Sequence, residues 1–116
     1  SFAISRPPKS VEKFLTDYKI NRDTDIDYFL IHQANKMIVD RIVKKLKLPQ
    51  EKVPYNLEEF GNLGGASIPS LMVTRLRKQL MSKETTLLMS SFGLGLTWGT
   101  MWMKTKPMVM PDIIGI

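Results

Sequence analysis

Cysteine is absent from this chain of 116 residues, and histidine occurs once, at position 32. The absence of cysteine excludes disulfide bonds, thiolate metal ligands and a cysteine nucleophile supplied by this chain. A zinc site needs several His, Cys or carboxylate ligands, and a single imidazole with no thiolate argues against one. We therefore expect no metal site.

Long apolar runs are also missing, because no stretch approaches the ~20 residues of a membrane-spanning helix. The first ten residues, SFAISRPPKS, lack the hydrophobic region and small-residue cleavage site of a secretory signal. We expect a cytoplasmic protein with no membrane partner.

Acidic residues are the minority: 17 Lys and Arg stand against 11 Asp and Glu, which gives a net charge of +6. A basic balance favours an anionic partner, such as nucleic acid, phosphate, an acidic protein or a membrane surface. Many basic surfaces have no such partner, so the net charge alone leaves these alternatives open.

Hydrophobic periodicity predicts an α/β fold in which a mixed sheet has helices packed on it. The expected elements, in chain order, are a helix over 8–18, a strand over 27–31, helices over 33–47 and 66–81, and strands over 85–92 and 97–105. Pro69 belongs in the first turn of a helix, so the third helix should begin near Ser67. The last two strands are separated by the short turn GLGL and should form an antiparallel hairpin.

Three short stretches stand at the ends of these elements, where functional groups are usually displayed. HQAN places His32 between a strand and a helix, FGNLGGAS places Asn62 before a helix, and SFGLGLTWG is a glycine-containing turn between strands. An imidazole, a carboxamide and the backbone N–H groups of a turn can all donate hydrogen bonds. Such a set of donors suits stabilisation of an oxyanion.

A nucleophile is not evident among these residues. Ser67 and Ser91 are the candidates by type, but neither lies in a G-x-S-x-G context. GLGLTWG does not match G-x-G-x-x-G and joins two strands, which argues against a dinucleotide site. FGNLGG lacks the Lys and Ser/Thr of a phosphate-binding loop. KKLK lacks the interleaved aromatic residues that binding of single-stranded nucleic acid would need.

HQAN, GNLGGASIPS and SFGLGLTWG, in this order and at this spacing, resemble the C-terminal half of β-ketoacyl-acyl carrier protein synthase III, a thiolase-fold condensing enzyme. The resemblance covers about residues 2–104, with 105–116 as an apolar tail that either packs as a strap or is disordered. It implies a half-domain whose first strand lies before this chain. It also implies a homodimer in the full enzyme and the absence of a cofactor.

The resemblance assigns His32 and Asn62 to a Cys–His–Asn triad whose cysteine lies in the other half, so this chain alone should be inactive. The cysteine takes an acyl group from acyl-CoA, and the two donors hold the enolate formed from malonyl-acyl carrier protein, a step of fatty acid biosynthesis. The backbone N–H of Leu94 is the expected oxyanion donor. The expected channel for the pantetheine arm comprises Ala34, Asn35, Phe92 and Gly93.

Docking of the acidic carrier protein is expected on the helix that follows His32, at Lys36, Arg41, Lys44 and Lys45. Two departures from the family pattern bear on these roles. The turn reads Phe-Gly-Leu-Gly where the family has Phe-Gly-Gly-Gly, and Met37 stands where the family has a docking arginine. The alternatives are a related acyltransferase of secondary metabolism and, outside the family, a basic module that binds RNA or an acidic protein.

Overall fold

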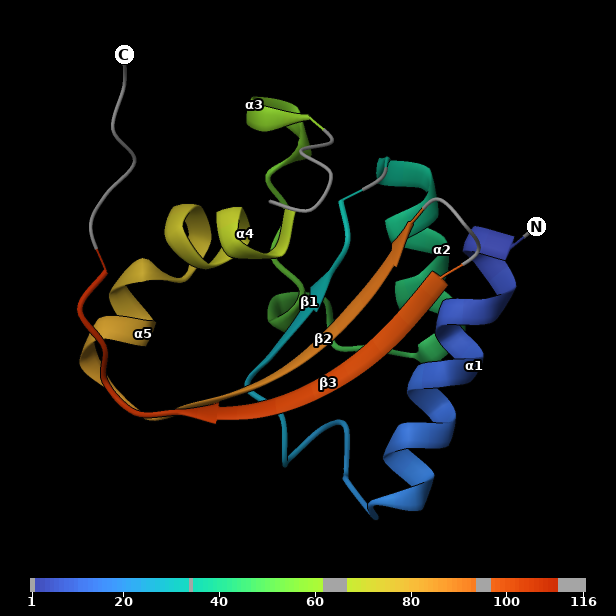
Figure 1. Cartoon of the computed structure of the whole chain (residues 1–116), viewed down its shortest axis with the longest axis horizontal. Helices are drawn as coiled ribbons and strands as arrows, with labels where there is room; N and C mark the ends of the chain where they lie inside the picture. Colours follow the sequence, from blue (N-terminus) through green and yellow to red (C-terminus); the bar gives the residue numbers. More distant parts are fainter. Residues whose placement is uncertain (1, 34, 62–66, 94–96, 111–116) are drawn as a thin grey trace.

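The sheet is mixed, and it stands at the centre of the molecule (Figure 1). The computed structural model describes residues 2–33, 35–61, 67–93 and 97–110. In these ranges three strands, β1 (Tyr28–Ile31), β2 (Thr85–Gly93) and β3 (Thr97–Thr105), form a sheet in the order β1-β2-β3. β1 runs parallel to β2, and β2 pairs with β3 in antiparallel fashion over its whole length. The predicted mixed sheet and terminal hairpin are thus confirmed.

Helices cover both faces of this sheet (Figure 1). The helical elements are α1 (Phe2–Asp17), α2 (Lys36–Leu46), the 3₁₀ turn η1 (Gln50–Lys52), α3 (Leu57–Phe60), α4 (Ser67–Arg75) and α5 (Arg77–Ser82). α1 and α2 pack on one face and α4 and α5 on the other. None of the helices in the described ranges is long and apolar enough to cross a bilayer.

Two hydrophobic clusters explain why β1 is apolar at every position. Phe29 and Ile31 pack with the buried residues of α1 and α2, whereas Leu30 packs with α4 and α5. On β2, Leu88 joins the first cluster and Leu87 the second. A parallel strand covered by helices on both faces needs apolar side chains in both directions. This burial holds β1, and the residue that follows it, in a fixed position.

The first and third predicted helices have different bounds in the structure. α1 begins at Phe2, so the prediction that a helix starts at Pro8 is wrong by six residues. Proline disfavours a helix interior but does not forbid it, and here Pro8 is buried against the rest of the fold. The third helix starts at Ser67 as predicted but is interrupted at Leu76, whose backbone leaves the helical region (φ −118°, ψ 7°). Leu76 and Leu80 still reach the same cluster.

The segment after the hairpin folds back onto α5. The backbone N–H of Met108 donates to the Leu80 carbonyl at 3.1 Å, and Arg77 Nε donates to the Met110 carbonyl at 2.9 Å. The side chain of Met110 is buried in the cluster of α4 and α5. Met108 and Met110 thus contact the cluster of α4 and α5, whereas Val109 between them is 93% exposed. Residues 111–116 lie outside the described residues, and the choice between a strap and a disordered tail stays a prediction.

Candidate functional site

His32 follows directly after the buried strand β1. Its backbone N–H donates to the Ser90 carbonyl at 2.9 Å, so the sheet ladder extends one residue beyond Ile31 and fixes the backbone of His32. The side chain is half-buried, and this burial lowers the pKa of the imidazole below its ordinary value of 6.5. His32 is therefore neutral at pH 7, when an imidazole carries one N–H that can donate.

α2 begins four residues after His32, and Asn35 caps it. Asn35 has an extended backbone (φ −157°, ψ 163°), and its side-chain oxygen accepts from the Ile38 N–H at 2.9 Å. The prediction that the helix starts at residue 33 is wrong, because a capped helix starts after its cap. Asn35, expected in the pantetheine channel, thus has a structural task of its own, and its side chain is exposed.

Gln33 and Asn56 form a buried polar connection that the sequence did not indicate. Gln33 Nε2 donates to the Ile31 carbonyl at 2.8 Å, and Gln33 Oε1 accepts from the backbone N–H of Asn56 at 3.3 Å. The Asn56 amide in turn donates to Ser70 Oγ at 2.9 Å and to Thr74 Oγ1 at 3.2 Å, both on α4. The connection therefore runs from the end of β1 to α4.

The structure places only some of the predicted site residues. Ala34, Asn62 and Leu94 lie outside the described residues. Phe92 and Gly93 end β2, where they pair with Trp98 and Thr97. Because Ile31 is in register with Ser90, the end of β2 that holds Phe92 and Gly93 is adjacent to the segment of His32.

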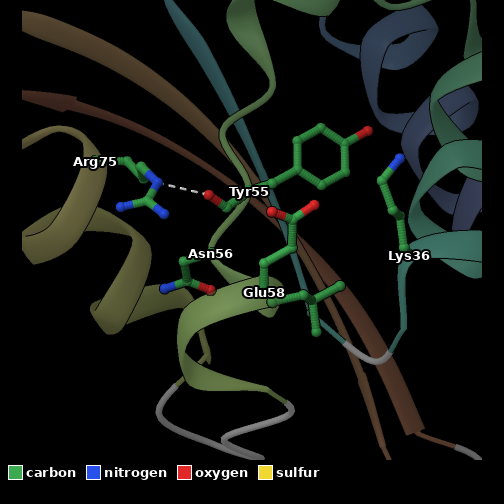
Figure 2. Close-up of a pocket in the computed structure, with 6 residues that line it drawn as sticks. Lys36, Tyr55, Asn56, Glu58 and Arg75 are labelled. Carbon is green, nitrogen blue, oxygen red and sulfur yellow. Dashed lines mark hydrogen bonds between the residues drawn. The ribbon is translucent and has the colours of Figure 1, made fainter.

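A pocket of about 360 Å³ lies between the start of α2 and the end of α4, and Asn56 is among the residues that line it (Figure 2). Its lining residues are Lys36, Tyr55, Asn56, Leu57, Glu58 and Arg75. Figure 2 shows Lys36 and Arg75 approaching from opposite sides, with Glu58 between them. Arg75 Nε donates to the Tyr55 carbonyl at 2.6 Å, and Tyr55 Oη donates to Asp40 Oδ1 at 3.0 Å. Burial, with Asp40 beside it, raises the pKa of the Tyr55 hydroxyl, so Tyr55 is a neutral donor here.

The predicted docking residues fall into two groups. Arg41, Lys44 and Lys45 are exposed on α2, and the two lysines stand in its last turn. Lys36 differs, because its ammonium lies 3.2 Å from Asp40 Oδ2 and 5.9 Å from the centre of the Tyr55 ring. Its charge is partly balanced within the chain and is less available to a partner. Within the described ranges, no group of three His, Cys, Asp or Glu residues could hold a metal ion.

Comparison with solved structures defines the class of fold. The chain is similar to a 3-oxoacyl-(acyl-carrier protein) synthase from Burkholderia xenovorans LB400, with a TM-score of 0.90 and 36% identity, covering 96% of this chain and 32% of that one. It is also similar to 3-oxoacyl-(acyl carrier protein) synthase III from Pseudomonas aeruginosa PAO1, with a TM-score of 0.80 and 31% identity, covering 94% of this chain and 34% of that one. The fold is therefore the C-terminal part of a thiolase-like condensing enzyme.

Sequence comparison gives the family. Residues 19–105 match the family model of the 3-oxoacyl-[acyl-carrier-protein] synthase III C terminal. The chain is 44% identical to β-ketoacyl-[acyl-carrier-protein] synthase III of Microcystis aeruginosa, over 84% of this chain and 29% of the relative. It is 40% identical to the synthase III of Streptococcus sanguinis, over 86% of this chain and 31% of the relative. The chain belongs to the synthase III C-terminal family, and it spans about a third of the length of these curated relatives.

Proposed function

We propose that this chain supplies the histidine and asparagine donors of a 3-oxoacyl-[acyl-carrier-protein] synthase III. The reaction is the decarboxylative condensation of an acyl-CoA primer with malonyl-acyl carrier protein in cytoplasmic fatty acid biosynthesis. The nucleophilic cysteine comes from the other half of the enzyme, which functions as a homodimer and needs no cofactor. Membership of the family supports this proposal, and the position of His32 carries it.

His32 has the properties that the proposed role demands. It stands at the end of a buried strand whose neighbour ends in Phe92 and Gly93, and burial lowers the pKa of its imidazole. A neutral imidazole donates one hydrogen bond to the thioester oxygen as negative charge develops there during loss of CO₂. A donor already in position needs no reorganisation in the transition state, and its removal typically costs ~10²–10³ in rate.

Asn62 and the backbone N–H of Leu94 complete the proposed donor set, with Asn62 beside His32 on the enolate and Leu94 on the acyl-enzyme. Ala34, Asn35, Phe92 and Gly93 line the pantetheine channel in this proposal. Arg41, Lys44 and Lys45 receive the acidic carrier protein, whereas Lys36 contributes less because Asp40 pairs with it.

The test uses His32→Ala and Asn62→Ala in the full-length enzyme, with two half-reactions measured separately. We expect malonyl-carrier decarboxylation to fall by about 10²–10³-fold in each variant. Acylation of the cysteine by acyl-CoA should continue, because neither residue is the nucleophile, and it serves as the control for correct folding. Normal decarboxylation in either variant would contradict the assignment.

A second candidate function is the same condensation reaction in secondary metabolism, where a synthase-III-like acyltransferase carries out the first, priming condensation. The chain is also similar to the priming β-ketosynthase from the R1128 polyketide biosynthetic pathway, with a TM-score of 0.76 and 25% identity. Leu94, in place of a glycine of the family pattern, favours a changed acyl pocket or a changed turn. Turnover with a panel of acyl-CoA primers of different length and branching, compared with that of a fatty acid synthase III assayed in the same way, separates the two.

A further inference from the structure

Gln33 lies inside the HQAN motif, yet its side chain points away from solvent and is fully buried. Its amide bridges two backbone groups, the Ile31 carbonyl at 2.8 Å and the Asn56 N–H at 3.3 Å. Ile31 immediately precedes His32, whose own N–H is held by Ser90. The backbone is therefore fixed on both sides of the imidazole as well as at His32 itself.

Asn56 continues the connection to the other side of the sheet. It is 1% exposed, and its amide nitrogen donates to the hydroxyls of Ser70 and Thr74 on α4. Those hydroxyls donate their own hydrogens to backbone carbonyls of α4, Ser70 to Ser67 and Thr74 to Ser70, both at 2.7 Å. Each hydroxyl therefore accepts from Asn56 through a lone pair. This fixes which group donates and which accepts in each of these hydrogen bonds.

From this arrangement we infer that Gln33 and Asn56 are positioning residues, which set the separation between His32 and α4. The inference rests on the proposed function, in which His32 must meet a substrate oxygen at hydrogen-bond distance. The donors of this network are satisfied, while the buried Asn56 Oδ1 has no hydrogen-bond partner among the described residues. The directional bonds that are made favour one arrangement of the elements they join, whereas apolar packing alone tolerates sliding. A misplacement of ~1 Å from a mutation outside the chemistry can cost about 10²-fold in rate.

A residue that positions His32 should affect the rate of catalysis when it is replaced, whereas a residue that only stabilises the fold should not. Thr105 offers the comparison, since it is 6% exposed and its hydroxyl donates to the Thr85 carbonyl at 3.2 Å. That bond lies at the end of β2 opposite to Ser90 and Phe92. Thr105→Val removes one buried hydrogen bond and keeps the shape of the side chain, so it reports the effect of lost stability without displacement of His32.

The experiment compares Gln33→Met with Thr105→Val in the full-length enzyme. Methionine keeps the length of glutamine and removes both of its hydrogen bonds. We expect Gln33→Met to lower kcat for malonyl-carrier decarboxylation by about 10–100-fold. KM and the rate of cysteine acylation should change by less than about twofold, because the defect lies in the transition-state contact rather than in binding. Thr105→Val should lower the melting temperature and leave kcat unchanged.

The inference is overturned if Gln33→Met lowers the rates of decarboxylation and of acylation equally. It is also overturned if Gln33→Met lowers kcat for decarboxylation no more than Thr105→Val does. If Gln33→Met does not fold, Thr74→Val decides, because it removes only one of the two acceptors of Asn56. We expect about a threefold loss of decarboxylation in Thr74→Val with acylation intact, and an unchanged kcat would overturn the inference. A wild-type rate in His32→Ala would instead show that the proposed function itself is wrong.

Discussion

Lys44 and Lys45 should govern the use of malonyl-acyl carrier protein and have no part in the use of acyl-CoA. Both are exposed in the last turn of α2, and neither takes part in an ion pair within the described part of the chain. Their full charge is therefore available to an acidic partner. The perturbations are Lys44→Gln with Lys45→Gln, which removes both charges, and Lys44→Glu with Lys45→Glu, which reverses them.

The magnitude follows from the exposure of these two lysines. An ammonium and a carboxylate ~4 Å apart in water attract by about 1 kcal/mol. Screening at physiological salt, where the Debye length is ~8 Å, reduces this to about 0.6 kcal/mol. Neutralising both lysines should therefore cost about 1.2 kcal/mol, or eightfold in kcat/KM, and reversal twice that, or roughly 60-fold. In 1 M salt the effect of neutralisation should shrink to about twofold.

The assay measures kcat/KM for malonyl-acyl carrier protein and for acyl-CoA, each at low and high salt. The matched control is Lys83→Glu with Lys106→Glu, which makes the same change of charge on two exposed lysines at the far end of the hairpin. This control variant should have the wild-type kcat/KM for both substrates. The reasoning is refuted if both substrates are affected equally, if the control pair has the same effect, or if the loss persists in high salt.

Two further predictions concern the elements around the site. Asn35→Ala should lower the free energy of unfolding by about 1 kcal/mol, because it removes the cap of α2, whereas Asn35→Asp should retain the stability of the wild type. Urea unfolding of the two variants measures this, and equal losses would contradict a capping role. Arg22 donates two hydrogen bonds to the Glu12 carboxylate, at 2.8 and 2.9 Å, and these bonds hold the pKa of Glu12 below 4.5. A lowered carboxyl pKa stabilises the fold above pH 4.5 and ceases to do so as the pH falls through the lowered value, so the stability difference between wild type and Arg22→Met should narrow in acid.

The strands could be predicted because their signals are local. The range 97–105 was predicted from TWGTMWMKT and is the observed extent of β3. The apolar run before His32 was predicted as a buried strand, and Phe29, Leu30 and Ile31 are each at most 2% exposed. Burial on both faces leaves a continuous apolar signature in the sequence, which is why the place of His32 at a strand end could also be predicted.

Features that depend on contacts between distant segments could not be predicted. Asn56 precedes the acidic first turn of α3 and has the composition of a helix cap, but its side chain makes no capping bond and reaches α4 instead. Gln33 is a polar residue next to a helix start, where sequence alone indicates exposure. Nothing local distinguishes a buried glutamine from an exposed one, because its partner is 23 positions away. The roles of all the predicted site residues, His32, Asn62 and Leu94 among them, stay predictions.

The parallel pairing of β1 with β2 has a consequence for the order of folding. Asp27 accepts a hydrogen bond from the Thr86 N–H across 59 positions of the chain, whereas β2 and β3 pair between close neighbours such as Gly93 and Thr97. Closing the longer loop costs roughly 2 kcal/mol more in chain entropy than closing the hairpin. The hairpin should therefore form early and the strand that presents His32 should dock late. Mutations in β1 should therefore accelerate unfolding more than they retard folding.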